Sequence, residues 1–342
     1  MIHEQFQKIT SAYSRLRIAI LGDFCLDRYL EIDPAHTETS IETGLPVHNV
    51  VNVRAQPGAA GTVLNNLVAL GIGTIFPVGF AGDDGEGFEL RRELGRLPGV
   101  RLDYFLQTPL RRTFTYCKPL VLEPHAPPRE LNRLDSKNWT PTPAAVESHF
   151  SHALHALEHQ LDALIVMDQV DLPQTGVITA AVLRELDSLV HRRPNLLVLA
   201  DSRRSLRGYP PVSLKMNRVE LGMLLSCPPP DDIQQVRSAA AELAKRNHRY
   251  VFVTLAERGL VGAAPSGKVE YLPALPLRGP IDIVGAGDSV SANLTASLAA
   301  GATLPEALQL ANAAASIVIH QLGTTGTASL PQLSHLLLPP TQ

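Results

Sequence analysis

The sequence predicts an α/β fold built on a mostly parallel β-sheet that helices cover on both faces. Short, continuously apolar segments recur along the chain, as in LDALIVMD over residues 161–168. Such runs are typical of strands that are buried on both faces. Each run leads into a segment that reads as a helix, and this alternation indicates parallel strand–helix–strand units.

The predicted elements follow one another in a regular order. The first strand, RIAILG at residues 17–22, ends on Gly22, and the first long helix ends at Gly71, where glycine favours a helix stop. Further strands are expected at 74–82, 161–168, 196–201, 213–217 and 250–259, and further helices at 84–97, 175–190, 231–246 and 288–300.

Composition limits the classes of protein that fit. The chain has 342 residues, of which 45% are hydrophobic and 18% charged, and its formal net charge is −3. This balance excludes the basic field of a general nucleic-acid or membrane-surface binder. No run approaches 18 consecutive apolar residues, no signal peptide is recognisable, and Cys25, Cys117 and Cys227 lie far apart. We therefore expect a cytoplasmic protein with reduced cysteines.

Two stretches interrupt the alternation of strands and helices. Residues 29–56 and 102–123 are rich in β-forming residues with turn residues between them. We expect them to form a small second sheet, mounted as a lid on a single domain that spans residues 1–342. Exposed sheet edges invite pairing with another chain, so a homodimer through this lid is also expected.

Polar residues stand where several predicted strands end. Parallel strands bring their carboxyl ends to one edge of the sheet, and binding sites of α/β proteins lie at that edge. A site there would include Asp23, Asp27, Asp168, Asp201 and Asn217. The alternative interpretation is that each residue is a helix cap or turn former.

A glycine-rich turn precedes the helix expected from residue 288. The stretch GPIDIVGAGDSVSANLTASLAAG at 279–301 places Gly285, Ala286 and Gly287 before a helix of small residues. Free amides at a helix N-terminus bind anions, and glycines allow a ligand close approach. Asp288 would repel that anion unless it takes a proton from a hydroxyl that receives a phosphoryl group. The alternative is a simple N-cap aspartate.

Six motifs in order resemble the ribokinase-like (PfkB) carbohydrate kinases. They are LGDFCLDRYL (21–30), PGAAGTVLNNLVALG (57–71), KMNRVE (215–220), TLAERG (254–259), DIVGAGD (282–288) and ANAAASIVIHQLGTTG (311–326). The resemblance covers nearly the whole chain. It implies a ribokinase-like three-layer sandwich with a β lid, and an ATP-dependent kinase that uses Mg²⁺ and phosphorylates a sugar hydroxyl.

The same resemblance implies a role for each matching residue. Asp288 would be the general base, and the amides of Gly285, Ala286 and Gly287 the anion hole. Asn217 and Glu220 would organise Mg²⁺ through water, because Mg²⁺ keeps several waters in such sites. The nucleotide would lie against Thr254, Glu257, Gly259 and Asn312, and the sugar against Asp23, Asp27, Gly58, Arg112 and Asp168.

Within this family, GDFCLDRYL, SIETGLPV, LNRLD and ANAAASIVIHQLGT most resemble the heptose 7-phosphate kinase domain of the bifunctional ADP-heptose synthesis enzyme. The sugar-side motifs depart from the family pattern, however. The usual paired glycine is Pro57-Gly58 or Gly58-Ala59. In the nucleotide loop, T-L-G-x-x-G, Ala256 replaces the first glycine. Two alternatives therefore stay open: a kinase of unphosphorylated sugars or nucleosides, and a catalytically silent sensing module. Arg111, Arg112, Lys118 and Arg133 are the candidate cations for a substrate phosphate.

Overall fold

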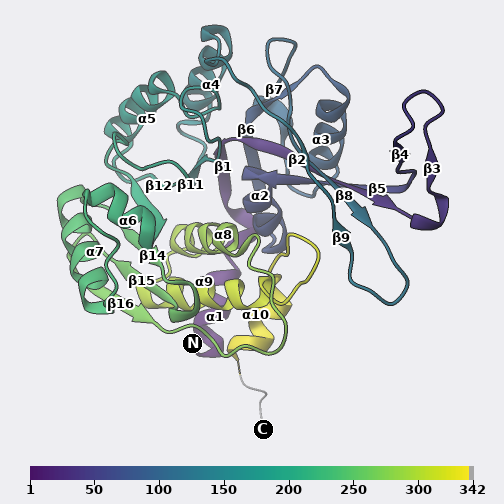
Figure 1. Cartoon of the computed structure of the whole chain (residues 1–342). Coiled ribbons are helices and arrows are strands. Elements are labelled where there is room, and N and C mark those ends of the chain that lie inside the picture. The colour runs from purple at the N-terminus through teal and green to yellow at the C-terminus, as the bar shows by residue number, and fades with distance from the viewer. Residues whose placement is uncertain (339–342) are drawn as a thin grey trace.

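The computed structural model describes residues 1–338 and is organised around one large sheet (Figure 1). The nine strands of this sheet have the spatial order β16-β15-β14-β13-β12-β11-β1-β6-β7. Their bounds are β1 Arg17–Gly22, β6 Thr74–Gly82, β7 Phe105–Thr108, β11 Ala163–Asp168, β12 Leu197–Ser202, β13 Ser213–Asn217, β14 Val251–Thr254, β15 Leu260–Ala263 and β16 Val269–Leu272.

The large sheet is mostly parallel, as the sequence predicts. Every neighbouring pair from β14 through β1 to β7 is parallel, and only β15 and β16 pair antiparallel to their neighbours. Consecutive residues of β1 alternate between two cores: Ile18 and Ile20 pack on one face, whereas Ala19 and Leu21 pack on the other. A strand buried on both faces needs apolar side chains at every position, which explains its continuous apolar run.

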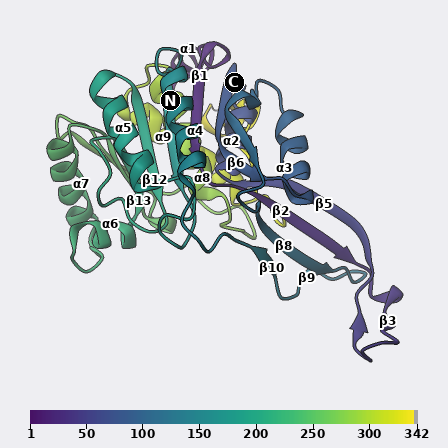
Figure 2. The same cartoon turned by 90° about the horizontal axis from the view of Figure 1, so that it is seen from above.

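Helices cover both faces and complete the three predicted layers (Figure 2). One core contains side chains of α1, α2, α3, α8, α9 and α10, and the other contains side chains of α4, α5, α6 and α7. Their bounds are α1 His3–Thr10, α2 Ala60–Ala69, α3 Gly85–Gly95, α4 Ala144–Leu157, α5 Ala180–Arg192, α6 Arg218–Leu225, α7 Ile233–Asn247, α8 Ala286–Ala299, α9 Leu304–Val318 and α10 Leu330–Leu337. Within residues 1–338, no helix is long and apolar enough to cross a membrane.

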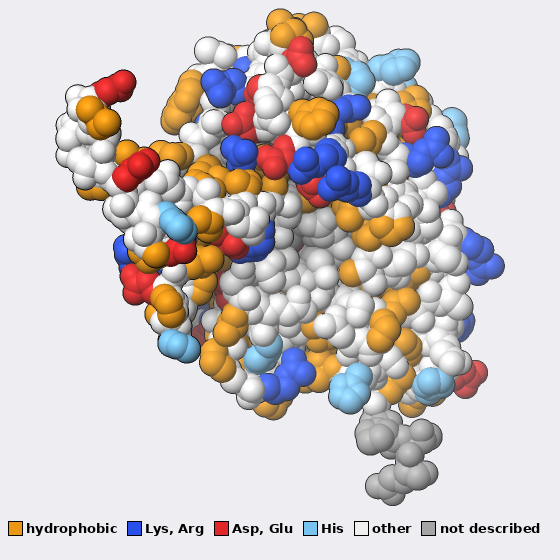
Figure 3. Space-filling view, turned by 90° about the vertical axis from the view of Figure 1, so that its right-hand side faces the viewer, with side chains coloured by type: hydrophobic (Ala, Val, Ile, Leu, Met, Phe, Trp, Pro, Cys, Tyr) orange, Lys and Arg blue, Asp and Glu red, His pale blue; other side chains and the backbone are white. Residues whose placement is uncertain are grey.

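A small second sheet projects from the body of the molecule (Figures 1 and 3). It contains β2 Phe24–Ile32, β5 Val50–Ala59, β8 Phe114–Val121, β9 Arg129–Glu130 and β10 Leu134–Ser136, and its tip carries the hairpin of β3 Glu38–Thr39 and β4 Pro46–Val47. The prediction that both stretches, 29–56 and 102–123, form the second sheet is therefore correct for the first and only partly correct for the second. The first contributes to β2 and β5 of this sheet and forms the separate β3–β4 hairpin at its tip, whereas the second divides, because β7 joins the edge of the large sheet and β8 joins the small one.

The carboxyl ends of five parallel strands meet at one edge of the large sheet. In register, Gly22 lies beside Met167, Asp168 beside Ser202, Asp201 beside Lys215, and Asn217 beside Thr254. The polar residues singled out from the sequence therefore line one edge. The small sheet leaves the body at the same edge, because β2 begins two residues after β1 ends.

Candidate active site

The glycine-rich turn forms the N-terminus of α8. Gly285 is the N-cap residue and has φ 82°, a left-handed conformation that favours glycine. A Cβ atom at this position would lie 2.7 Å from the Thr325 side chain. Because a side chain is excluded here, the amides of the first turn stay accessible. The turn thus has the form of an anion-binding helix N-terminus.

Asp288 is in the first turn of α8 and is half-buried. Burial raises the pKa of its carboxyl from 3.8 to about 7, with Lys215 lowering it and Asp201 raising it. Among residues 1–338, no hydrogen bond engages this carboxylate. An unengaged carboxylate with a pKa near neutrality suits a group that accepts a proton at physiological pH.

Lys215 is a site residue that motif reading missed. It is buried near the end of β13, and its Nζ lies 2.6 Å from Asp201 Oδ2 on β12. A Cβ atom on Gly287 would lie 3.0 Å from the same Nζ, so the ammonium group is beside the first turn of α8. Asp201, Asp288 and Glu220 raise the pKa of Lys215 against the lowering effect of burial. A permanent positive charge therefore lies beside the predicted anion hole.

Asn217 and Glu220 form a capping box at the start of α6. Asn217 Oδ1 accepts hydrogen bonds from the amides of Val219 and Glu220, at 2.8 and 2.9 Å. Glu220 Oε2 in turn accepts one from the Asn217 amide at 2.7 Å. The N-x-x-E spacing is thus explained by capping alone. Glu220 Oε1 takes no part in this box, so one oxygen of a half-buried carboxylate is available.

The residues predicted on the nucleotide side lie along β14 and α9. Thr254 ends β14 beside Asn217, and Glu257 is exposed on the short turn that follows. Gly259 has φ 100°, and a Cβ there would lie 2.1 Å from the Leu272 carbonyl oxygen. Asn312 is buried, and its Nδ2 donates to the Pro273 carbonyl at 2.9 Å. Asn312 therefore anchors the segment that follows β16.

Both departures from the family glycines carry backbone strain. Ala59 has φ 54° and ψ −118°, a conformation that favours glycine and so supports Gly58-Ala59 as the counterpart of the usual paired glycine. Ala256 has φ 51°, in the left-handed region. An alanine at positive φ places Cβ against the backbone, which glycine avoids. The alanines change the backbone energy of these two turns.

Asp27 is the best-placed acid on the side of the small sheet. It is buried on β2, 3.5 Å from Lys118 Nζ on β8, and burial raises its pKa more than Lys118 lowers it. A Cβ at Gly58 would lie 2.4 Å from Asp27 Oδ2. Gly58 therefore makes room for this carboxylate, which explains why the two predicted residues occur together.

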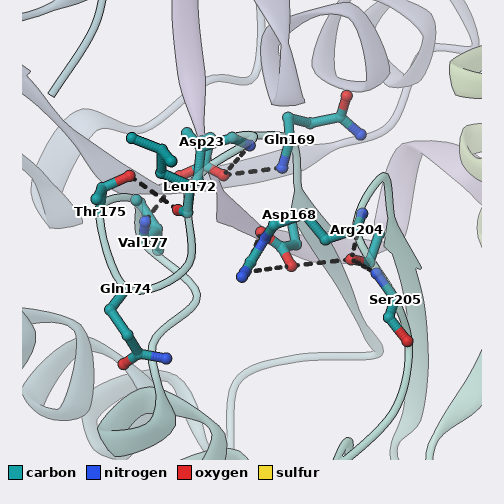
Figure 4. Close-up of polar contacts among 12 residues, drawn as sticks. Asp23, Asp168, Gln169, Leu172, Gln174, Thr175, Val177, Arg204 and Ser205 are labelled. Atoms are coloured by element: carbon teal, nitrogen blue, oxygen red, sulfur yellow. Dashed lines mark hydrogen bonds and ion pairs between the residues drawn. The ribbon is translucent and has the colours of Figure 1, made fainter. Parts of the chain in front are cut away.

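Asp23 has both carboxylate oxygens engaged by the backbone (Figure 4). Oδ2 accepts from the amides of Gln169 and Val170, at 2.8 and 3.3 Å, and Oδ1 from Val177 at 2.7 Å. A Cβ at Gly176 would lie 2.3 Å from Oδ1. Asp23 thus holds the loop between β11 and α5 to the end of β1.

Asp168 is likewise engaged by protein groups. Arg204 Nη2 lies 2.9 and 2.8 Å from its two oxygens, and Ser202 Oγ donates to Oδ2 at 2.9 Å. Figure 4 shows this ion pair beside the Asp23 loop. Because the pair is buried on the Asp168 side, it fixes the segment after β12 to the end of β11.

Two of the candidate phosphate-binding cations have structural contacts. The buried Arg111 donates to the carbonyls of Thr140 and Thr175 and lies over the Phe80 ring. The exposed Arg112 has its amide and carbonyl paired with the side chain of Asn138. Lys118 and Arg133 remain on the face of the small sheet that carries Asp27, where Arg133 also pairs with Asp135 at 2.7 Å.

This geometry defines a class of protein: a three-layer α/β domain with a helix-terminal anion site and a carboxylate beside it. The particular family follows from comparison with known proteins. The model of the pfkB family carbohydrate kinases matches residues 24–332, so the chain belongs to that family and is a carbohydrate kinase.

Curated relatives include two proteins named "Bifunctional protein HldE". The one from Bradyrhizobium sp. (strain ORS 278) is 29% identical over 335 residues, which cover 98% of this chain and 66% of the relative. The one from Pelobacter propionicus is 31% identical over 328 residues, which cover 94% and 64%. The chain therefore spans somewhat under two thirds of the length of these relatives.

Solved structures confirm the ribokinase-like fold. Ribokinase from Arabidopsis thaliana, complexed with ribose and ATP, superposes with a TM-score of 0.64 at 18% identity and covers 94% of this chain and 97% of its own. Phosphofructokinase-2 from Escherichia coli, in complex with fructose-6-phosphate, gives 0.69 at 19% identity with the same coverages.

Proposed function

We propose that this kinase transfers the γ-phosphoryl group of ATP to a sugar hydroxyl, with Asp288 as the general base. The observation that carries the proposal is the unengaged Asp288 carboxylate, with its pKa near 7, in the first turn of α8. The amides of Gly285, Ala286 and Gly287 would stabilise the charge on the transferred group. The relatives solved with ATP or ADP support the choice of nucleotide.

Mg²⁺ is the metal that we expect with the nucleotide. Among residues 1–338, no group of three or more His, Cys, Asp and Glu side chains forms a metal cage. Mg²⁺ usually takes one or two carboxylates together with waters and substrate phosphates. Glu220 Oε1 and the neighbouring Asn217 would contact it through water, and the ion would neutralise phosphate charge. Excess chelator is expected to abolish turnover.

For the acceptor we propose a sugar phosphate, with heptose 7-phosphate as the first candidate. The support is the similarity of this chain to proteins named HldE, together with an acid on the small sheet that has cations around it. Asp27 would bind a sugar hydroxyl through a charge-assisted hydrogen bond.

An ATP-consumption screen across sugars, nucleosides and sugar phosphates tests these proposals together. Turnover that requires a heptose or hexose phosphate supports the proposed acceptor, whereas equal use of the neutral sugars supports the broader sugar kinase. Binding of sugar or nucleotide without any turnover would instead favour the silent sensing module.

We also propose that the small sheet is a lid and forms a homodimer. β5 is an edge strand, and its Val50, Val51 and Val53 side chains are exposed. Exposed apolar edges pair readily with a second copy. Light scattering over a range of concentrations tests the homodimer. A monomer at every concentration would exclude the dimer but would not contradict the proposal that the small sheet is a lid.

A further inference from the structure

The segment that joins β16 to α8 contains no helix or strand. It covers residues 273–285, runs alongside α9 and ends at Gly285, the N-cap of the proposed anion hole (Figure 1). Its Leu277, Ile281 and Ile283 side chains are 61%, 42% and 73% exposed. Because burial of apolar side chains contributes little here, the position of this connecting segment depends on its polar contacts.

His320, directly after α9, makes one of these contacts. The amide of Arg278 donates to His320 Nε2 at 2.9 Å, and His320 Nδ1 lies 2.6 Å from the Ser316 carbonyl oxygen. A backbone amide can only donate, and a carbonyl can only accept. The imidazole is therefore neutral, with its proton on Nδ1 and a lone pair on Nε2 that accepts the amide of Arg278.

The end of α9 holds the connecting segment at two residues. The Ser316 carbonyl is one of the last in α9, where carbonyls lack a partner within the helix, and it also accepts from Arg278 Nη2 at 3.1 Å. Arg278 is thus bound to α9 through both its main chain and its side chain. Closer to Gly285, the Asp282 amide donates to the Ile319 carbonyl at 2.8 Å.

A second proton on His320 is incompatible with this arrangement. Histidine is the side chain that gains a proton between about pH 8 and 5. Once protonated, Nε2 has no lone pair and would turn an N–H toward the Arg278 N–H. The imidazolium would also share the Ser316 carbonyl with the like-charged guanidinium of Arg278. The neutral form of His320 is therefore the one that holds the segment.

The other charged groups around His320 are few. On the connecting segment, Asp282 is the second charged residue, and its Oδ1 accepts from the Val284 amide at 3.0 Å. The sequence has no charged side chain at residues 307–318 of α9 or at residues 321–329, and the titratable group of α10 is His335. The contact with Arg278 is thus the main one that a proton on His320 would change.

We propose that neutral His320 is a positioning residue for phosphoryl transfer, because it fixes the connecting segment and with it the anion hole that begins at Gly285. This inference rests on the proposed kinase function. His320 acts through the amide of Arg278, and we place it in contact with neither ATP nor the acceptor. Its loss should therefore lower kcat more than it changes either KM.

The kinetic test compares His320→Phe and His320→Gln with the wild-type protein. Glutamine keeps an acceptor for the Arg278 amide and does not titrate, whereas phenylalanine keeps only the size of the ring. At pH 8, His320→Phe should lower kcat about tenfold with little change in the KM for ATP, and His320→Gln should recover most of the loss. The control is His152→Gln, because His152 is exposed on α4, across the large sheet from α9.

Nitrogen NMR of the imidazole and hydrogen exchange of the Arg278 amide separate this inference from the kinase proposal, because neither requires turnover. We expect the Nδ1–H tautomer at pH 8. The protection factor of the Arg278 amide should fall about fivefold between pH 8 and 5.5 in the wild-type protein and stay constant in His320→Gln. If no acceptor is turned over, the kinase proposal fails, and these measurements still decide whether His320 fixes the segment.

Three results overturn the inference. They are an Nε2–H tautomer at pH 8, an Arg278 protection factor that is the same in His320→Phe as in wild type, and a kcat of His320→Phe equal to that of His152→Gln when the wild-type protein is active. The last result would leave the kinase proposal intact and show that the His320 contact serves the fold alone.

Discussion

Asp288 and Asp23 both lie at the carboxyl edge of the large sheet, and burial raises the pKa of each to about 7. Their surroundings are nevertheless opposite. The Asp288 carboxylate has no hydrogen-bond partner within the described chain, whereas Asp23 accepts three backbone amides. A shifted pKa alone therefore does not identify a base. A proton acceptor also needs an oxygen that the protein has not already used, and among the described residues Asp288 meets this condition whereas Asp23 does not.

The same contrast separates the two ends of the site. At the α8 end, the candidate residues are contiguous, and the helix itself orients their amides. At the small-sheet end, Asp23, Asp168 and Arg111 are all engaged in holding loops, and Asp27 remains available beside Lys118. The contiguous motif thus has the local geometry that the sequence predicted, whereas several of the isolated polar residues at strand ends hold loops in place.

The largest expected effect is that of Asp288→Asn, which removes the base. Turnover should fall about 100-fold or more, while ATP binding stays close to that of wild type. In the wild-type protein, kcat/KM should rise with pH through about 7, because Asp288 accepts a proton only once it is ionised. Steady-state kinetics from pH 5 to 9 checks both points. Near-normal turnover in the variant would remove Asp288 as the base.

Asp288→Asn should also change stability with pH in a definite direction. The folded-state pKa lies above the unfolded value of 3.8, so the folded protein holds this proton more tightly between about pH 4 and 7. The contribution of Asp288 to stability is therefore present below pH 4 and is lost as pH rises through 7. The neutral variant should melt at a higher temperature than wild type at pH 8, with a smaller difference at pH 5.

Asp23→Ala should act on stability rather than on chemistry. It leaves the amides of Gln169, Val170 and Val177 without their acceptor, at a cost of about 2–3 kcal/mol. Denaturant unfolding measures this cost. The matched comparison is Asp27→Asn, which should leave the unfolding free energy nearly unchanged and raise the KM for the acceptor. Equal destabilisation by both variants would contradict the distinction between the two acids.

Lys215→Met should lower turnover less than Asp288→Asn does, and it should also shift the pH dependence of kcat/KM. Removing this cation takes away an attraction that lowers the pKa of Asp288, so the rising limb of the pH profile should move to higher pH. We expect turnover near pH 7 to fall about tenfold. An unshifted profile would show that the Lys215–Asp201 pair serves the fold alone.

The smallest expected effect is that of Ala59→Gly. Glycine adopts the φ 54° and ψ −118° of this position without steric conflict, so the variant should be more stable by about 1 kcal/mol. Thermal melting checks the sign, with Ala60→Gly as the control, because Ala60 is the first residue of α2. A destabilised Ala59→Gly protein would mean that the surrounding structure favours alanine despite its φ.

The sequence by itself determined the strand–helix alternation, the order of the family motifs and the Gly285–Asp288 turn, because these depend on local periodicity and on contiguous residues. Only the tertiary structure could show that Asn217 and Glu220 form a capping box and that the Asp23 carboxylate accepts hydrogen bonds from backbone amides. It also showed that β7, from the second β-rich stretch, pairs with the large sheet and not with the small one. It also brought Lys215 beside Gly287 and paired Arg204 with Asp168. The physical reason is that register and side-chain pairing between distant segments depend on three-dimensional packing, which residue spacing along the chain does not encode.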